Sequence, residues 1–453
     1  MRHRFGACPV PLAALVLAVI LPAAARAQDS NYWSLAYGTR SQLLGGVMIG
    51  SPGDISSVYY NPGALALAQN VELLISGSAY RYQRLSIDGG SGPGRNLVSS
   101  WLAATPSLFA GEIPILDHDR LAYSFLGRHQ SNMEMMGRFT AGSEIPPTSP
   151  DLSALELDFN QNLSENWFGL TWAHKLSSTL GIGVSPYLGV RSQNTGISAF
   201  RSSQDAASTA SVFNVSRRFD YLHWRLLARF GLSGVRDSLT YGLVFTTPGL
   251  GLFGGGGLRA NTTLVDESGQ FGHIAGASYQ TEIKADYRSP MGVGAGASYG
   301  WGATRIHAAV EWNAEVPRYE VMHGDDYIIR TPSGDSTATL IVDQELDAVL
   351  NYGVGIERRL SPTLFGYASF HTDYSGRQPT DLANASVSSW DLSHVSAGAT
   401  WHVFRSDLTL GASTAFSSQP LPPSQVTEII GANPDLESHV MMITVLAAWK
   451  IAF

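Results

Sequence analysis

Alternation of apolar with polar or small residues is the dominant pattern of this chain. Near the C-terminus, a largely apolar row occupies every second position and consists of His439, Met441, Ile443, Val445, Ala447, Trp449, Ile451 and Phe453. The same period of two recurs over 180–191, 347–357 and 407–416. Because successive side chains of a β-strand point to opposite faces, each stretch predicts a strand with one apolar face.

Short and long connections alternate between the predicted strands. The candidate short turns are 117–119, 176–178, 235–238, 300–302, 360–362 and 404–406, and the long connections lie at about 83–97, 132–160, 193–216, 247–275, 316–345, 375–389 and 418–437. Outer-membrane barrels have short periplasmic turns and long extracellular loops. The order predicts an all-β fold, a 14-stranded antiparallel transmembrane β-barrel over 71–453. Residues 276–300 count as one strand, kinked at Pro290.

A soluble β-sandwich also has alternating strands, so composition has to separate the two folds. Charged residues make up 15% of the chain, against about 25% in typical soluble domains. After the leader, no apolar run reaches the ~20 residues that a membrane helix needs. Trp449 and Phe453 fit the aromatic girdle of a membrane barrel. These features favour the outer-membrane barrel.

Residues 1–27 have the form of a secretory signal peptide. Arg2 and Arg4 precede an apolar run at 10–21, and Ala25-Arg26-Ala27 is an A-x-A cleavage site. The run is too short to span ~30 Å of hydrocarbon as a helix, so we expect cleavage before Gln28. Cys8, the one cysteine, lies in this leader, so the mature chain is expected to hold neither a disulfide nor a cysteine-bound metal.

The charge balance and the scattered histidines exclude several functions. The leader takes three of the 29 basic residues and none of the 37 acidic ones, which leaves a formal charge of −11 and no basic tract. Nucleic acid is therefore not an expected partner. The 12 histidines form no spaced cluster, and "GLFGGGG" lacks the Lys and Ser/Thr of a phosphate loop. We expect no metal or other cofactor, and an outer-membrane lipase or protease is a weak alternative.

Residues 28–70 do not alternate and precede the first convincing strand. They hold apolar residues that disfavour a disordered tail, namely Leu43, Leu44, Val47, Met48, Ile49, Val58 and Tyr59. We predict that this segment folds into the barrel lumen as a plug, or hatch, which a simple diffusion porin would not need. Gly292, Gly294 and Gly296 would face the lumen and make room for the hatch backbone.

The stretch "LLGGVMIGSPGDISSVYYNPGALAL" (43–67) resembles the hatch of the FadL-type outer-membrane transporters, which carry long-chain fatty acids and other hydrophobic compounds. The shared pattern is the Gly45-Gly46 pair and the tripeptide Asn61-Pro62-Gly63, with Gly63 in place of the usual Ala. Residues 289–320 are similar to paired strands of the family, and the terminal Phe also matches. The shuttle barrels of type IX secretion share the hatch motif, so a secretion role with a protein partner is the alternative function.

The resemblance implies roles for three groups of residues. Asn61, Pro62 and Gly63 would form a hatch latch, because an Asn-Pro turn is stiff, and Gly63 would loosen it slightly. Leu250, Leu252, Phe253 and Leu258 would lie in an extracellular loop that captures a hydrophobic ligand, or would contact lipopolysaccharide acyl chains. The barrel assembly machinery would recognise Trp449, Ile451 and Phe453. The protein is expected to act as a monomer in a Gram-negative-type outer membrane.

A fatty acid in the lumen also needs a cation for its carboxylate. In 219–232, alternation points Leu222, Trp224, Leu226, Ala228, Phe230 and Leu232 to lipid, and it points Arg225 and Arg229 to the lumen. Arginine can donate two hydrogen bonds to a carboxylate. Arg305 and His307 alternate in the same way. Alternatively, these cations pair with lumenal carboxylates such as Glu311 or Glu357.

Overall fold

The computed structural model describes most of the chain. The described ranges are 25–26, 31–68, 73–90, 96–115, 118–140, 152–204, 209–267, 272–376, 390–404, 406–421 and 436–451. Most of the predicted leader and the terminal Phe453 lie outside them. None of the helices in these ranges is long and apolar enough to cross a membrane.

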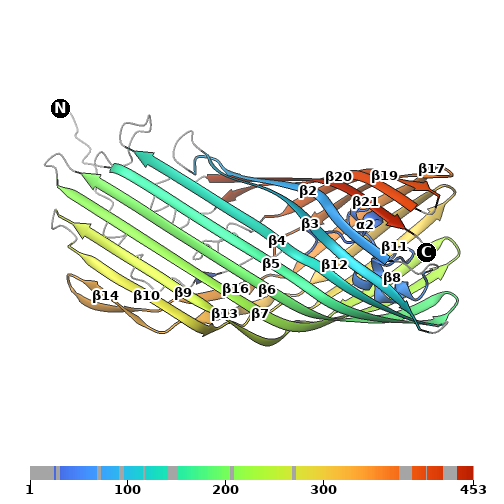
Figure 1. Cartoon of the computed structure of the whole chain (residues 1–453), viewed down its shortest axis with the longest axis horizontal. Helices are drawn as coiled ribbons and strands as arrows, with labels where there is room; N and C mark the ends of the chain where they lie inside the picture. Colours follow the sequence, from blue (N-terminus) through green and yellow to red (C-terminus); the bar gives the residue numbers. More distant parts are fainter. Residues whose placement is uncertain are drawn as a thin grey trace, which may run out of the picture.

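Strands make up nearly all of the regular structure (Figure 1). The helices are α2 (Thr39–Leu43), α3 (Ser57–Tyr60) and α4 (Pro62–Leu65). The strands of the first half are β1 (Ala25–Arg26), β2 (Leu73–Ile87), β3 (Leu97–Pro114), β4 (Asp119–Thr140), β5 (Leu152–Ser177), β6 (Leu180–Gln204), β7 (Ala210–Arg236), β8 (Leu239–Thr246), β9 (Leu250–Asp266) and β10 (Ile274–Lys284). The strands of the second half are β11 (Gly292–Trp301), β12 (Thr304–Asn313), β13 (Val316–His323), β14 (Tyr327–Thr331), β15 (Gly334–Ala338), β16 (Ile341–Leu346), β17 (Val349–Ser361), β18 (Leu364–Asp373), β19 (Leu392–Val403), β20 (Ser406–Leu421) and β21 (Leu436–Ile451).

The large sheet forms a barrel of antiparallel strands. Eighteen of the described strands belong to it, and β2 pairs with both β3 and β21, so the order of pairing returns to its first strand. The six predicted short turns are confirmed to within a residue or two, as between β5 and β6 or between β17 and β18. The all-β antiparallel fold is therefore confirmed, while the count of 14 spanning strands stays a prediction.

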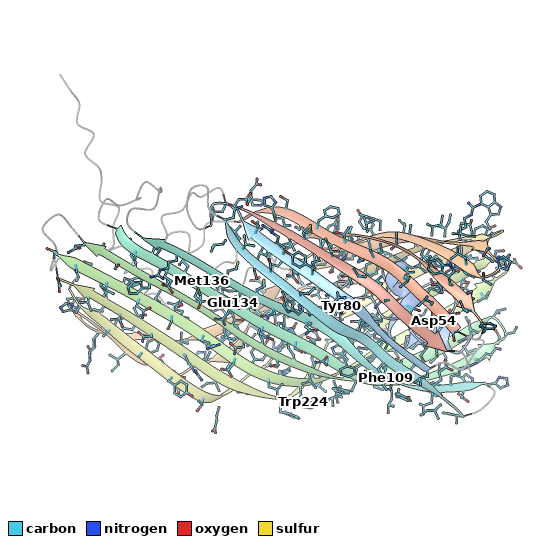
Figure 2. The ribbon with its side chains drawn as sticks, turned by 45° about the horizontal axis from the view of Figure 1, so that its top comes forward. Asp54, Tyr80, Phe109, Glu134, Met136 and Trp224 are labelled. Atoms are coloured by element: carbon cyan, nitrogen blue, oxygen red, sulfur yellow. The ribbon has the colours of Figure 1, made fainter. Side chains whose placement is uncertain are left out.

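The outer face of the barrel carries the predicted apolar rows (Figure 2). On β7, Leu222, Leu226 and Phe230 are exposed, whereas Arg225 and Arg229 are buried on the opposite face. Equivalent exposed rows occur on β12, β17 and β21. Apolar side chains on the outside of a sheet and buried polar ones on the inside are the pattern of a barrel that faces lipid.

One side of the barrel wall is much taller than the predicted strands. Strands β5, β6 and β7 contain 26, 25 and 27 residues, whereas a tilted strand crosses the bilayer in ~9–11. On β5 the outer row changes from Phe168, Leu170 and Trp172 to polar residues such as Asn162, while inward-facing Leu157 and Leu163 are buried. Much of the sequence predicted as long loops at 132–160 and 193–216 is therefore strand, and the prediction was wrong there.

Two further predictions around the middle of the chain are wrong. Residues 247–258 are not a loop, because β9 starts at Leu250 and pairs with β7 and β10. The predicted single strand 276–300 is broken into β10 and β11, which pair with β9 and β8 respectively. Pro290 lies in the break, where the kink was predicted.

A small sheet lies on the inner face of the barrel, in sequence that was predicted to be an extracellular loop. It contains β13 and β16, and β1 pairs with β16 in parallel. Val316, Val321 and Val342 are buried in one cluster with Phe219 of β7 and Leu258 of β9. The hairpin β14–β15 extends the wall beside β10 instead. Within 316–345, β13 and β16 therefore lie on the inner face of the barrel, and β14 and β15 form part of its wall.

Candidate functional site

The segment 31–68 lies inside the barrel, where α4 contacts β5, β6 and β7 and α2 contacts β18, β19 and β20. Nearly all of its apolar side chains are buried. Figure 1 shows α2 enclosed by the strands. We call residues 31–68 the hatch segment from here on. Its contacts with the wall define the candidate site.

Asn61 joins three parts of the structure through its side-chain amide. Its Nδ2 donates to the carbonyl of Ile49 at 2.9 Å and to that of Leu232 on β7 at 3.0 Å. Its Oδ1 accepts from the backbone N–H of Gly63 at 3.1 Å and so caps α4, whose first residue is Pro62. Asn at an N-cap with Pro at the first helical position is a favoured start for a helix. The motif therefore fixes α4 and ties it to the wall.

Gly63 approaches the wall more closely than any other residue type would allow. A Cβ at this position would lie 2.6 Å from the carbonyl oxygen of Gly231 and 2.7 Å from that of Gly181. The sequence-based expectation that Gly63 loosens the turn therefore misses its main effect, which is to let α4 touch β6 and β7.

A belt of wall glycines surrounds the hatch segment. Added Cβ atoms at these positions would meet hatch atoms within 3.0 Å, and they are Gly181, Gly183, Gly231, Gly242, Gly294, Gly296, Gly353, Gly355, Gly398 and Gly411. The prediction for Gly294 and Gly296 is confirmed, since both face Ile49. Gly292 instead faces Asn313 of the wall.

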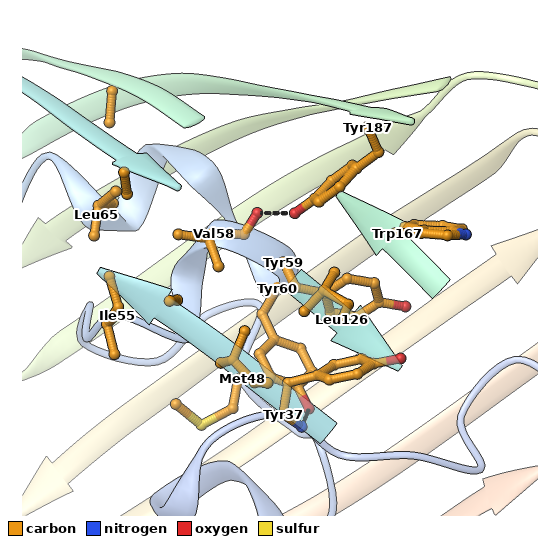
Figure 3. Packing of buried hydrophobic residues seen from close by; sticks show 14 of the residues in the cluster. Tyr37, Met48, Ile55, Val58, Tyr59, Tyr60, Leu65, Leu126, Trp167 and Tyr187 are labelled. Atoms are coloured by element: carbon orange, nitrogen blue, oxygen red, sulfur yellow. Dashed lines mark hydrogen bonds between the residues drawn. The ribbon is translucent and has the colours of Figure 1, made fainter. Parts of the chain in front are cut away.

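Aromatic side chains fill the space between the hatch segment and β4 to β6 (Figure 3). Tyr59 and Tyr37 have ring centroids 4.4 Å apart, and Tyr59 lies 6.2 Å from Trp167 of β5. Tyr187 of β6 and its neighbour Ser185 both donate to the carbonyl of Val58. Burial raises the pKa of the Tyr37 and Tyr60 phenols, so both hydroxyls stay protonated.

An ion pair ties the hatch segment to strand β17. Arg40 Nε donates to Glu357 Oε2 of β17 at 2.6 Å, and Arg40 Nη1 lies 3.8 Å from Asp54 Oδ2. Burial alone would lower the pKa of Arg40, but the carboxylates of Glu357 and Asp54 raise it above its ordinary value. The guanidinium is therefore charged at any physiological pH.

Asp373 of β18 anchors the start of the hatch segment. Its Oδ1 accepts from the backbone N–H groups of Tyr32 and Trp33, both at 2.8 Å, and its Oδ2 accepts from Ser34 Oγ at 2.6 Å. Asn31 Nδ2 donates to the Asp373 carbonyl at 2.7 Å. A fully buried carboxylate that receives three such hydrogen bonds is strongly held in place.

Arg225 and Arg229 face the lumen as predicted, and each already has a carboxylate partner. Arg225 Nη2 and Arg191 Nη1 both donate to Glu165, and Arg229 Nη1 lies 3.7 Å from Glu311 Oε1. The structure therefore favours the alternative in which these arginines pair with wall carboxylates. A ligand carboxylate would have to replace a resident one.

The cation cluster touches the hatch segment directly. The Arg229 guanidinium lies 4.3 Å from the Tyr59 ring centroid, and Glu311 Oε2 accepts from Trp33 Nε1 at 3.0 Å. Arg128 of β4 lies 5.5 Å from the Trp167 ring. Arg128, Trp167, Arg229 and Glu311 line a pocket together with Asn31 and Tyr32.

The seam between β3 and β4 is only partly hydrogen-bonded in the described residues. Pairing covers Leu108 to Pro114 with Leu126 to Arg120, although both strands continue beyond Leu108 and Leu126. The register of β4 against β5 shifts between Gly127 and His129, so Arg128 forms a bulge at the upper end of the paired region. Bulges of this kind commonly mark functional positions in a barrel wall.

Arg305 and His307 do not join Arg225 and Arg229. Arg305 is near the β11–β12 turn, where its Nη1 donates to Ser298 Oγ at 3.3 Å. His307 is fully buried, and its Nδ1 lies 2.8 Å from Ser51 Oγ of the hatch segment. The four predicted cations therefore belong to separate sites, and His307 contacts the hatch.

The predicted capture residues do not form one surface. Leu250, Leu252 and Phe253 are exposed on the outer face of β9, and Phe253 lies 5.5 Å from Trp224. Leu258 is buried on the inner face. A Cβ at Gly256 would lie 1.8 Å from the Asp220 carbonyl oxygen, so this glycine serves close strand packing rather than loop flexibility.

The predicted assembly signal is described only through its backbone. Trp449 and Ile451 belong to β21 and pair with Leu408 and Ser406 of β20. Phe453 lies outside the described residues. Recognition by the assembly machinery stays a prediction.

Sequence reasoning missed Asp373, Glu165 and Arg81. Glu165 could have been found, since it alternates with Trp167 on the inward row of a recognisable strand. Asp373 and Arg81 could not have been found in this way, because their partners are distant in the sequence. Asp373 binds Trp33, 340 residues away, and Arg81 binds Ser34, 47 residues away.

The chain is similar in structure to several solved proteins, although its sequence shows no such similarity. No protein-family profile and no curated protein sequence matches the chain. It is similar to a Pseudomonas aeruginosa FadL homologue (11% identity, TM-score 0.54, 92% of this chain and 100% of that chain). It is also similar to the Pseudomonas putida toluene transporter TodX (13%, 0.60, 94% and 100%) and the Ralstonia pickettii toluene transporter TbuX (13%, 0.56, 92% and 99%). The predicted resemblance is thereby confirmed for the fold, which is that of the FadL-type outer-membrane transporters.

Proposed function

We propose that this protein is a passive outer-membrane transporter for hydrophobic small molecules, gated by the hatch segment. The observation that carries the proposal is the packing of residues 31–68 against a belt of wall glycines inside the barrel. A segment so closely fitted fills the bore, and side-chain hydrogen bonds hold it there, among them those of Asn61, Ser51, Arg40 and Asp373. Such a segment can keep water out of the bore, and it can still be displaced when these side-chain hydrogen bonds break.

Two observations support the proposed class of substrate: the lining of the lumenal pockets and the similarity to solved transporter structures. The toluene transporters and the FadL homologue named above share the fold, and the lumenal pockets here combine apolar and cationic side chains. An apolar molecule that carries one carboxylate, such as a long-chain fatty acid, suits this mixture. Metal chemistry has no support in the described residues, where no cluster of metal-ligating side chains occurs.

Passage is proposed to use the seam between β3 and β4. The unpaired stretch above Leu108 lies beside Arg128, which lines the same pocket as Arg225 and Arg229. A molecule in that pocket, which Asn31 and Tyr32 of the hatch segment also line, would enter the outer leaflet once the hatch segment has moved aside. The exposed Leu250, Leu252 and Phe253 would then face lipid or lipopolysaccharide acyl chains rather than capture the ligand.

The experiment is uptake in a Gram-negative strain that lacks its own fatty-acid transporter. Expression of the chain is expected to restore uptake of radiolabelled oleate, and the Asn61→Ala/Pro62→Ala variant is expected to change that rate although the barrel assembles normally. Loss of the amide removes the bonds to Ile49 and Leu232, each worth about 0.5–1.5 kcal/mol.

Two results would oppose this function. Normal assembly without uptake of either oleate or toluene would contradict it, and co-purification of a protein partner in that case would favour the secretion shuttle. An unchanged rate in the Asn61→Ala/Pro62→Ala variant would contradict the latch role alone. Assembly is checked by the heat-dependent shift in electrophoretic mobility that folded barrels show.

A further inference from the structure

Arg81 is a buried arginine that has no carboxylate partner among the described residues. It points inward from β2 and is 8% exposed. Its Nη2 donates to the Ser34 carbonyl at 3.2 Å, but its Nε has no hydrogen-bond partner in the described residues. No carboxylate of those residues lies within 4.0 Å of its guanidinium. A buried charge without a counter-ion is costly, so Arg81 requires an explanation.

Two histidines face the same pocket as Arg81. His371 of β18 and His394 of β19 are buried and stacked, with ring centroids 4.3 Å apart. Among the described residues, neither ring nitrogen of His371 has a hydrogen-bond partner, and the same is true of His394 Nε2. A neutral imidazole always carries one N–H, so each ring can donate one hydrogen bond into the pocket.

The Asp373 carboxylate near the two histidines already accepts hydrogen bonds from other groups. Its Oδ2 lies 3.9 Å from His394 Nε2, which is beyond hydrogen-bond distance. Its oxygens accept from Tyr32, Trp33 and Ser34, as described above. Asp373 is not one of the residues that line the pocket. Arg81, His371 and His394 therefore line a pocket that has no carboxylate among its lining residues in the described part of the chain.

The rest of the pocket combines apolar side chains with neutral polar ones, the latter being Ser34, Gln42, Ser396, Ser413 and Thr444. Trp33 and Leu35 of the hatch segment line it on one side, and Ala415, Met442 and Leu446 of β20 and β21 line it on the other. The pocket therefore offers one charged donor, neutral hydrogen-bonding groups and, from Trp33, Leu35, Ala415, Met442 and Leu446, an apolar surface. This combination matches a molecule with an apolar body and one anionic oxygen group.

We propose that Arg81, His371 and His394 form a headgroup site for the carboxylate of a hydrophobic acid. This inference rests on the proposed transport function and specifies its substrate: an aliphatic acid rather than a neutral hydrocarbon. It also moves the headgroup from Arg225 and Arg229, which already pair with wall carboxylates, to Arg81, for which the described residues supply no such partner. Because Trp33 and Leu35 line the site, the bound acid touches the start of the hatch segment.

The test compares two ligands that differ only in the headgroup. Dodecanoate and dodecanol are titrated against the purified full chain in lipid nanodiscs, and binding is followed by tryptophan fluorescence, since Trp33 lines the pocket. The unmodified protein is expected to bind the acid on the order of 10- to 100-fold more tightly than the alcohol, from charge-assisted hydrogen bonds. Arg81→Met is expected to abolish this preference, so that acid and alcohol bind with similar affinity.

Matched variants separate recognition from structure. Arg84→Met removes an exposed arginine of the same strand and is expected to keep the preference, and Arg81→Lys is expected to keep part of it. Equal affinity for acid and alcohol in the unmodified protein would overturn the proposal. The proposal would also be overturned if Arg81→Met and Arg81→Lys both lost affinity for dodecanoate and dodecanol to the same extent. That result would indicate that Arg81 has a structural role.

The same ligands distinguish failure of this site from failure of the transport function. If cells expressing the chain take up dodecanol but Arg81→Met does not alter the preference for dodecanoate, the site is wrong and the transporter stands. If neither compound is taken up by an assembled barrel, the transport function itself fails and this inference fails with it.

Discussion

Replacement of Gly63 by Ala is expected to open the barrel to small ions. A Cβ at this position overlaps the carbonyl oxygens of Gly231 and Gly181, and backbone atoms on two wall strands cannot move aside easily. Overpacking of this kind costs about 1–3 kcal/mol. A shift of that size changes the ratio of displaced to seated hatch by about 5- to 150-fold. Single-channel recordings in planar bilayers should show frequent open events in Gly63→Ala and few in the unmodified protein.

The control for this prediction is another glycine-to-alanine change in the wall. A Cβ at Gly255 would meet only the Ile283 carbonyl oxygen, at an ordinary 3.5 Å, so Gly255→Ala should leave the conductance unchanged. If Gly63 affected only the local turn, its replacement by Ala would leave the conductance unchanged. Conductance in Gly63→Ala that equals that of Gly255→Ala would show that α4 does not seat against β6 and β7 as described.

Replacement of Glu165 by Gln is expected to cause the largest loss of stability. The Glu165 carboxylate is 4% exposed, accepts from Arg191 and Arg225, and accepts from Trp167 Nε1 at 2.7 Å. A neutral amide leaves both arginines without a counter-ion and turns one of its donors toward them. Removing one partner of a buried ion pair costs about 3–5 kcal/mol. The urea midpoint of the folded barrel, followed by electrophoretic mobility, should fall accordingly.

Glu134 supplies the matched control for this change. It lies on the outer face of the neighbouring strand β4 and is exposed (Figure 2), so Glu134→Gln should keep the midpoint of the unmodified protein. Combining Glu165→Gln with Arg225→Leu should recover part of the loss, because one of the two uncompensated charges is then absent. A midpoint for Glu165→Gln equal to that of Glu134→Gln would contradict the buried ion network.

Strand positions and their two faces were predictable because they depend on a local period. Alternation along 219–232 assigned Leu222 and Phe230 to the outside and Arg225 and Arg229 to the lumen, and the structure confirms this. The height of the wall was not predictable from the same template. Above the membrane band the apolar row of β5 moves from its outer face to its inner face, from Phe168 to Leu163, so a search for lipid-facing rows stops there.

The structural roles of the glycines were the hardest to predict, because they depend on contacts between distant parts of the chain. The run 254–257 indicated a flexible loop, but Gly256 belongs to β9, where it lies against the backbone of Asp220. Gly63 indicated a looser turn, but it lies in contact with two wall strands. A glycine has the same local signature in both roles, so only the neighbours brought close by the fold distinguish them.

The ion pairs of the site were beyond the reach of sequence for a related reason. A strand pattern shows that Arg225 faces the lumen but not which carboxylate meets it across the barrel. Glu165 lies 60 residues away, and Asp373 holds Trp33 from a distance of 340 residues along the chain. Pairing with lumenal carboxylates was one alternative expected from the sequence. Which carboxylate pairs with which arginine became known only from the three-dimensional structure.

The most direct test of the account joins the hatch segment to the wall with a disulfide. A Cβ on Gly355 of β17 would lie 3.7 Å from the Cβ of Leu44, close to the ~3.8 Å typical of a disulfide, and the mature chain is expected to have no other cysteine. The Leu44→Cys/Gly355→Cys variant should oxidise readily in the assembled barrel, lose uptake of oleate, and regain uptake after reduction. Failure of the two cysteines to pair, or equal uptake by the oxidised and reduced forms, would contradict a hatch that fills the bore and moves to admit substrate.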